Sequence, residues 1–63
     1  MKILRLRQVL ELTGLSRSTL YLYIQNQQFP SQVRLGPKIV GWVEDEVSNW
    51  IGERIQIRNS ETR

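Results

Sequence analysis

The short connection at residues 14–16, Gly-Leu-Ser, constrains the fold more than any other part of the chain. Before it, apolar or half-polar side chains recur with the i, i+3, i+4, i+7 spacing of one helix face, at Leu6, Val9, Leu10 and Thr13. This spacing predicts a helix from Leu6 or Arg7 to Thr13. Gly14 follows at once, and glycine can adopt the left-handed conformation that ends a helix.

A second helix is expected to begin directly after this connection. The hydroxyl of Ser16 can accept a hydrogen bond from the backbone N–H of Ser18 or Thr19, as the first residue outside a helix commonly does. The second helix is therefore predicted from Arg17 to Gln25 or Asn26. Two helices joined by so short a turn cross at a steep angle, as in a helix-turn-helix.

The second half of the chain is predicted to form a hairpin and a long helix. Phe29-Pro30 ends the helical region, because the residue before a proline is pushed toward extended geometry. Strand-forming residues at 32–35 and 38–42 flank Gly36-Pro37, which predicts two short strands joined by a Gly-Pro turn. The run from Glu44 to Ile57 or Asn59 is predicted to be helical, with acidic residues at its start that suit the helix dipole. Residues 59–63 are expected to fray.

These elements predict a fold that is mainly α with a small β-hairpin, in the order helix, helix, hairpin, helix. We interpret residues 1–63 as a single winged helix-turn-helix domain. Trp42 and Trp50 are expected in its core, because large aromatic residues are more often core than ligand platforms.

Composition excludes several classes of function. The chain contains neither cysteine nor histidine, so the commonest metal ligands and the commonest general base are missing. The acidic run at 44–46 does not make a metal site, because adjacent residues on a helix point in different directions. No apolar run approaches the roughly 20 residues that cross a bilayer. We expect no enzyme activity, no cofactor, no metal and no membrane contact, and a location in the bacterial cytoplasm at the nucleoid.

Charge is distributed unevenly along the chain. Residues 1–43 hold six lysines and arginines against Glu11 alone, whereas residues 44–63 hold three arginines against five acidic residues. The first part is basic enough to attract a polyanion such as double-stranded DNA.

The predicted second helix has an outward face suited to DNA. If Leu20 points to the core, then Ser18, Leu22 and Gln25 point away from it, and no acidic residue shares that face. Hydroxyl and amide groups contact phosphates or base edges, and an apolar side chain such as Leu22 can contact a thymine methyl. The predicted DNA-binding residues, with two from the hairpin, are Ser16, Arg17, Ser18, Thr19, Tyr21, Leu22, Gln25, Arg34 and Lys38.

Simpler explanations stay open for three of these residues. Tyr21 can be an ordinary half-buried aromatic, and Arg34 and Lys38 can be solvated turn residues. Arg17 is harder to explain without a ligand, since the helix dipole disfavours a cation at a helix start.

The sequence also resembles a known family. LELTGLSRSTLY, the pair Phe29-Pro30, VRLGPKIVGW and a following acidic helix that contains a tryptophan are similar to the AlpA family. These are small phage and prophage DNA-binding regulators with a MerR-like or excisionase-like winged helix-turn-helix. The resemblance implies binding near an integrase gene or attachment site, with residues 16–19 and Tyr21 in the recognition segment and LGPK as the wing. Leu22 departs from the family pattern, where a basic residue is common.

Two functions within this class stay open, as do two outside it. The protein either activates integrase transcription or acts in prophage excision together with a phage-type integrase. Because one small domain makes few phosphate contacts, cooperative self-association on adjacent DNA sites is also expected. A protein interaction module that offers Tyr21 and Leu22 to a partner is the alternative of another class, and an enzyme is the weakest option.

Overall fold

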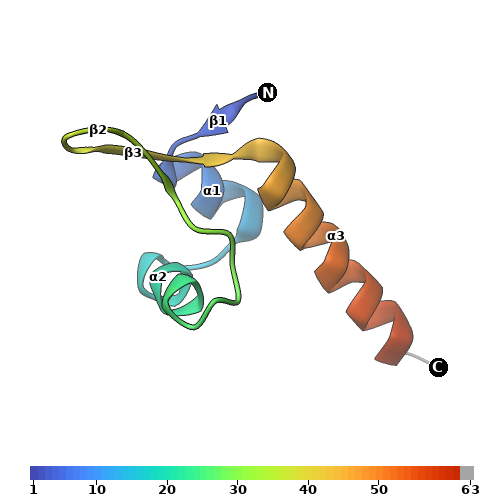
Figure 1. Cartoon of the computed structure of the whole chain (residues 1–63). Helices are drawn as coiled ribbons and strands as arrows, with labels where there is room; N and C mark the ends of the chain where they lie inside the picture. The colour runs from blue at the N-terminus through green and yellow to red at the C-terminus, as the bar shows by residue number, and fades with distance from the viewer. Residues whose placement is uncertain (62–63) are drawn as a thin grey trace.

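The computed structural model describes residues 1–61 and contains three helices and three short strands (Figure 1). In chain order the elements are β1 (Ile3–Leu4), α1 (Leu6–Thr13), α2 (Arg17–Gln25), β2 (Val33–Gly36), β3 (Ile39–Val43) and α3 (Glu44–Glu61). The strands form an antiparallel sheet in the order β1-β3-β2. The predicted winged helix-turn-helix is confirmed, and β1 is an element that the sequence analysis missed.

The connection between α1 and α2 has the predicted geometry. Gly14 has a φ of 73°, and its N–H donates to the Leu10 carbonyl at 2.8 Å. The Ser16 hydroxyl accepts from the N–H of Thr19 at 3.2 Å, which fixes where α2 begins. The phase of α2 is therefore set by a local hydrogen bond, and Leu20 is fully buried as that phase requires.

The turn of the hairpin lies one residue later than predicted. Gly36 still belongs to β2 and pairs with Ile39, so the turn residues are Pro37 and Lys38. Proline is favoured at the first central position of a turn because its φ is already fixed near the required value. The pairing slips between Arg34 and Gly36, which leaves Leu35 in a bulge.

The strand β1 ties the start of the chain to the base of the hairpin. Ile3 pairs with Val43 and Leu4 with Trp42, and the N–H of Glu44 donates to the Lys2 carbonyl at 2.8 Å. The residues just after β1 are consequently held beside the wing.

The core lies where α1, α2 and the start of α3 meet β3. Its buried side chains are Leu4, Val9, Leu20, Phe29, Trp42 and Val47. Trp42 is fully buried, as predicted, whereas Trp50 is only half-buried. The expected core position of Trp50 is thus only partly correct.

The helix α3 extends beyond the rest of the molecule (Figure 1). It continues to Glu61, so the predicted end at Ile57 or Asn59 is too early, and residues 62 and 63 of the segment expected to fray lie outside the described part. A helix that is already formed gains one hydrogen bond for each residue added, and no glycine or proline follows Gly52 to stop it. Within residues 1–61, no helix is both long and apolar enough to cross a membrane.

Candidate nucleic-acid interface

The outward face of α2 carries the three side chains predicted there. Ser18, Leu22 and Gln25 are exposed, and Leu22 keeps 52% of its surface accessible. No acidic residue occurs anywhere in α2. A protruding helix with an uncharged polar face and one leucine at its centre can therefore approach a polyanion without repulsion.

Two side chains at the start of α2, those of Ser16 and Thr19, form hydrogen bonds that cap the helix. The Ser16 hydroxyl accepts from the Thr19 N–H and donates to the Thr19 side-chain oxygen at 2.9 Å. Thr19 is half-buried. Both residues hold the start of the helix in place, and Arg17 beside them remains exposed.

Tyr21 is half-buried and packs against the core. Its ring meets the Trp42 ring edge to face, with centroids 6.4 Å apart and planes at 62°. This contact fits the simpler explanation given for Tyr21 in the sequence analysis. The same residue nevertheless lines a surface hollow, so one edge of the ring is accessible from outside.

Four basic residues surround that hollow, which has a volume of ≈ 430 Å³. We call it the basic hollow, and its lining consists of Arg5, Leu6, Arg7, Arg17, Tyr21, Lys38 and Val40. They come from the start of α1, from α2 and from the wing. The hollow thus brings together Arg17 and Lys38, two predicted site residues that are 21 positions apart in sequence, and no acidic residue lines it.

Arg5 and Arg7 line the basic hollow but were not predicted as site residues. Their placement depends on β1, which pairs with β3 and so holds the start of α1 against the wing. The backbone N–H of Arg5 donates to the Gln8 side-chain oxygen at 2.9 Å, which fixes the first turn of α1. The sequence does contain one signal for these residues, because two arginines flank the first position of the predicted helix. The pairing of β1 with β3 is what brings both of them beside the wing.

The basic side chains of this region are little neutralised by acidic ones. Within residues 1–61 the single ion pair joins Arg7 to Glu11 at 3.9 Å, and both side chains are largely exposed. Arg5, Arg17 and Lys38 accordingly have no carboxylate within 4 Å in this part of the chain. Their charge is available to a ligand.

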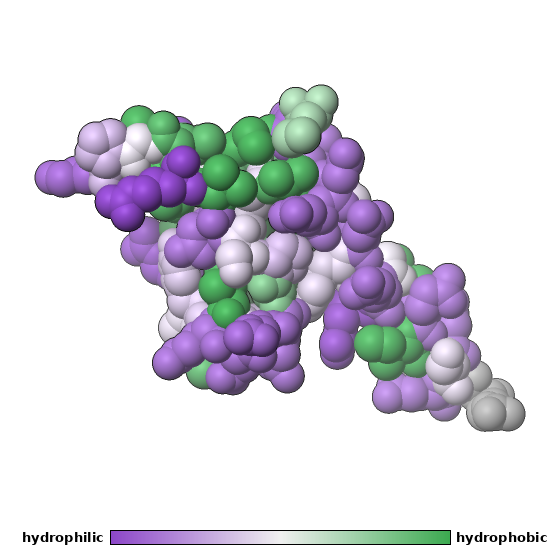
Figure 2. Space-filling model, viewed as in Figure 1, coloured by the Kyte–Doolittle hydropathy of each residue, from purple (hydrophilic) through white to green (hydrophobic). Residues whose placement is uncertain are grey.

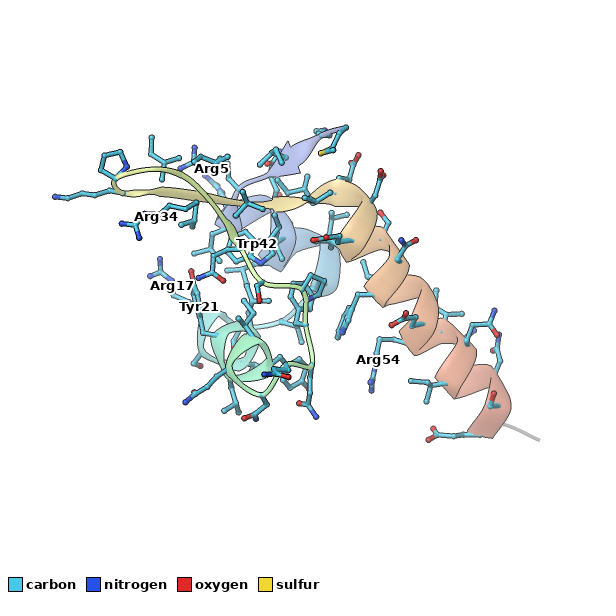
Figure 3. The ribbon with its side chains drawn as sticks, in the orientation of Figure 1. Arg5, Arg17, Tyr21, Arg34, Trp42 and Arg54 are labelled. Atoms are coloured by element: carbon cyan, nitrogen blue, oxygen red, sulfur yellow. The ribbon has the colours of Figure 1, made fainter. Side chains whose placement is uncertain are left out.

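Arg34 lies on the wing but does not line the hollow. Its guanidinium donates to the Pro37 carbonyl at 3.1 Å and braces the turn. Figure 3 shows Arg5, Arg17 and Arg34 on the side of the molecule that carries the wing, and Arg54 on the side of α3. Figure 2 shows hydrophilic side chains at the end of the wing and over α2, with a hydrophobic band along the sheet.

No group of three or more acidic, cysteine or histidine side chains within residues 1–61 could hold a metal ion. The chemistry that the described surface offers is therefore that of cationic, hydroxyl and amide groups around an aromatic and apolar floor.

Comparison with known proteins gives one family and two relatives. Residues 2–55, which include α1, α2 and the wing, match the family described as prophage CP4-57 regulatory protein (AlpA). The protein ORF88 of Enterobacteria phage P4 is 48% identical over 54 residues, which are 86% of this chain but only 61% of the phage protein. The DNA-binding transcriptional activator AlpA of Escherichia coli (strain K12) is 36% identical over 62 residues, with 89% of each chain covered.

Proposed function

Because the chain belongs to the AlpA family of prophage regulatory proteins, we propose that it is a sequence-specific DNA-binding regulator of transcription. The observation that carries this proposal is the basic hollow, to which the start of α1, α2 and the wing contribute cationic side chains and which no acidic residue lines. In a winged helix-turn-helix, the second helix enters the major groove and places its first residues near the base edges.

We assign base recognition to the outward face of α2. Gln25 can pair with adenine through the oxygen and the NH2 of its side-chain amide, and Leu22 can contact a thymine methyl. Ser18 can reach either a base edge or a phosphate. Arg17 lies at the start of α2, where a guanine or the adjacent phosphate comes within reach.

The basic hollow supports a role in holding the DNA backbone. Successive phosphates that pass Arg5, Arg17 and Lys38 would meet cations from the start of α1, from α2 and from the wing. Such contacts fix the register of the protein on the duplex but carry little sequence information. Arg34 extends the same charge along the wing, toward the next phosphates or the minor groove.

Two regulatory roles use this one DNA-binding surface. The relative named as a transcriptional activator favours control of a promoter, which we propose to be that of a nearby integrase gene. The alternative is a direct role in prophage excision beside a phage-type integrase. An excision assay with purified integrase, run with and without this protein, distinguishes them, because an activator adds nothing when no transcription takes place.

A mobility-shift titration against DNA that flanks the integrase gene and attachment site tests the DNA binding itself. We expect the logarithm of the binding constant to fall linearly with the logarithm of salt concentration, by about 0.9 for each phosphate neutralised. Several adjacent sites that fill cooperatively would support self-association on DNA. Arg54→Ala serves as the control, because it removes one positive charge from the opposite side of the molecule. Binding that persists at high salt would contradict the proposal and favour a protein interaction module.

A further inference from the structure

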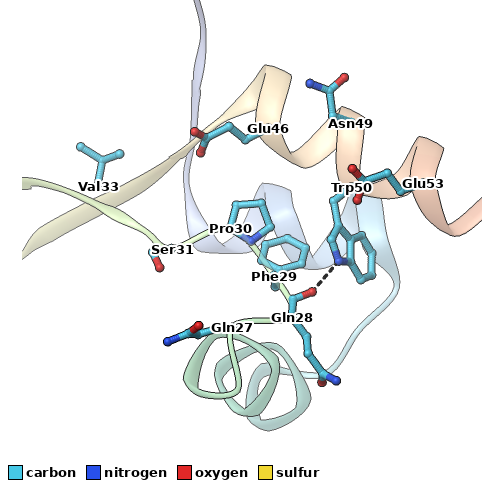
Figure 4. Close-up of a pocket in the computed structure, with 10 residues that line it drawn as sticks. All are labelled: Gln27, Gln28, Phe29, Pro30, Ser31, Val33, Glu46, Asn49, Trp50 and Glu53. Carbon is cyan, nitrogen blue, oxygen red and sulfur yellow. Dashed lines mark hydrogen bonds between the residues drawn. The ribbon is translucent and has the colours of Figure 1, made fainter.

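A second hollow, with the opposite charge, lies between α3 and the loop that joins α2 to β2 (Figure 4). It has a volume of ≈ 600 Å³ and shares no residue with the basic hollow. Its floor is formed by Phe29, Pro30 and Trp50, and its α3 rim carries Glu46, Asn49 and Glu53. We call it the acidic groove.

The floor of the acidic groove is held in a fixed shape. The Trp50 indole N–H donates to the Gln28 carbonyl at 2.7 Å, which ties α3 to the loop (Figure 4). The Phe29 ring packs against the Trp50 ring with centroids 4.8 Å apart and planes at 64°. A preformed apolar floor lowers the entropic cost of ordering the site when a ligand binds.

The rim follows from the helical repeat of α3. Glu46, Asn49 and Glu53 stand at i, i+3 and i+7, so they share one face, and Trp50 at i+4 completes it. The backbone positions of Glu46 and Glu53 are separated by about 10 Å along the helix axis, because each residue adds about 1.5 Å. They stand at two points along the rim and not as one cluster.

No ion pair within residues 1–61 neutralises the acidic groove. No lysine or arginine lines it, although the chain as a whole has a net charge of +3. Within residues 1–61, neither Glu46 nor Glu53 has a cationic group within 4 Å. The nearby Arg54 lies over the Trp50 ring, 5.8 Å from its centroid, and lines two neighbouring hollows, one of which Glu53 also lines.

We propose that the acidic groove binds a short lysine- or arginine-bearing segment of a partner protein. Carboxylates repel a nucleic acid and attract a cationic side chain, while the aromatic floor can cover its aliphatic stem. The volume lies within the roughly 300–1,000 Å³ of pockets that hold small ligands, so the bound segment is a few residues long. The proposal does not rest on DNA binding, since the groove uses none of the residues assigned to DNA.

The test is selection from a random peptide library against the full chain in the absence of DNA, because a polyanion would itself retain basic peptides. We expect the selected peptides to be enriched in lysine and arginine beside an apolar residue. Their affinity should fall about tenfold in the double variant Glu46→Gln, Glu53→Gln, in line with the modest strength of solvent-accessible ion pairs. The double variant Asp45→Asn, Glu61→Gln is the matched control, because it removes the same charge from α3 outside the groove.

The two tryptophans give a direct readout of where a selected peptide binds. The Trp50 indole N–H signal in an NMR titration should move, whereas that of Trp42, which is fully buried, should not. Four results would overturn the proposal: no selected peptide, no enrichment in basic residues, equal affinity for the groove variant, or a shift confined to other residues. Concentration-dependent movement of the Trp50 signal without any peptide would also overturn it, because a second copy of the chain would then be the occupant.

Discussion

A leucine stands at the centre of the outward face of α2, where 52% of its surface is accessible. Water around such a side chain is unfavourable, so Leu22 is expected to gain from a contact with an apolar group such as a thymine methyl. Leu22→Arg should raise affinity for all DNA, through an added phosphate contact, and reduce the preference for the cognate sequence. Mobility shifts with cognate and scrambled duplexes measure both effects. A variant that keeps the full preference would show that Leu22 contacts no base.

Among the predicted DNA-binding residues, Arg17 is the one whose presence the fold explains least. It is exposed, it has no acidic partner within 4 Å in the described part of the chain, and it lies at the positive end of α2. Arg17→Ala should weaken binding to the cognate site by about 1–3 kcal/mol and reduce sequence preference, if its guanidinium contacts a guanine. Titration of the variant beside Arg54→Ala checks this. Unchanged affinity and preference would remove Arg17 from the site.

The position of a side chain could be predicted from the sequence where nearby residues determine it, and not where a distant segment does. The exposure of Ser18, Leu22 and Gln25 followed from the sequence, because the cap at Ser16 fixes the phase of the helix within one turn. Arg5 could not be assigned in this way, since its place beside the wing depends on a strand pairing with residues almost forty positions later.

At the level of elements, the structure requires glycine at position 41 in β3 but not at position 52 in α3. A Cβ added to Gly41 in β3 would clash with the Ile3 side chain and lie 3.1 Å from the Leu4 carbonyl, because β1 passes close to it. A Cβ added to Gly52 in α3 meets nothing within 4 Å. Glycine is therefore needed in the strand, but in the helix it only adds freedom to the unfolded chain.

Alanine at these two positions should change stability in opposite directions. Gly52→Ala should raise the free energy of unfolding by about 0.5–1 kcal/mol, the usual gain inside a helix. Gly41→Ala should lower it by about 1–3 kcal/mol, the usual cost of overpacking. Urea unfolding followed by circular dichroism measures both. If Gly41→Ala were as stable as the wild type, the close approach of β1 to β3 would be wrong.

The elements that carry local end signals were the predictable ones. The end of α1 and the start of α2 were placed correctly because Gly14 and Ser16 act through hydrogen bonds to nearby residues. The strand β1 has two residues and is defined by its partner, so no periodicity reveals it. The end of α3 was placed too early because a helix without a stop signal continues past its last packed side chain.

On the scale of the whole molecule, the uneven charge of the sequence becomes two separate surfaces. The basic residues of the first part meet in the hollow beside the wing, and the acidic residues Glu46 and Glu53 line the groove beside α3. Uneven charge along the chain predicted the first surface. It could not predict the second, because the groove depends on the loop from Gln27 to Ser31 folding against α3. The two surfaces share no residue, so the two proposed ligands do not compete for the same side chains.

The salt dependence of binding tests whether the basic hollow contacts the DNA backbone. Arg5→Ala and Lys38→Ala should each lower affinity uniformly across sequences and reduce the slope of log K against log salt by about one. The double variant should reduce it by about two, because Arg5 just before α1 and Lys38 in the turn of the wing are expected to neutralise separate phosphates. The substitution Arg54→Ala should leave the slope unchanged, because Arg54 lies on the side of α3. A slope that Lys38→Ala does not alter would mean that the wing makes no phosphate contact. If only Arg5→Ala had no effect, the phosphate contacts would be confined to α2 and the wing, and the start of α1 would serve the fold alone.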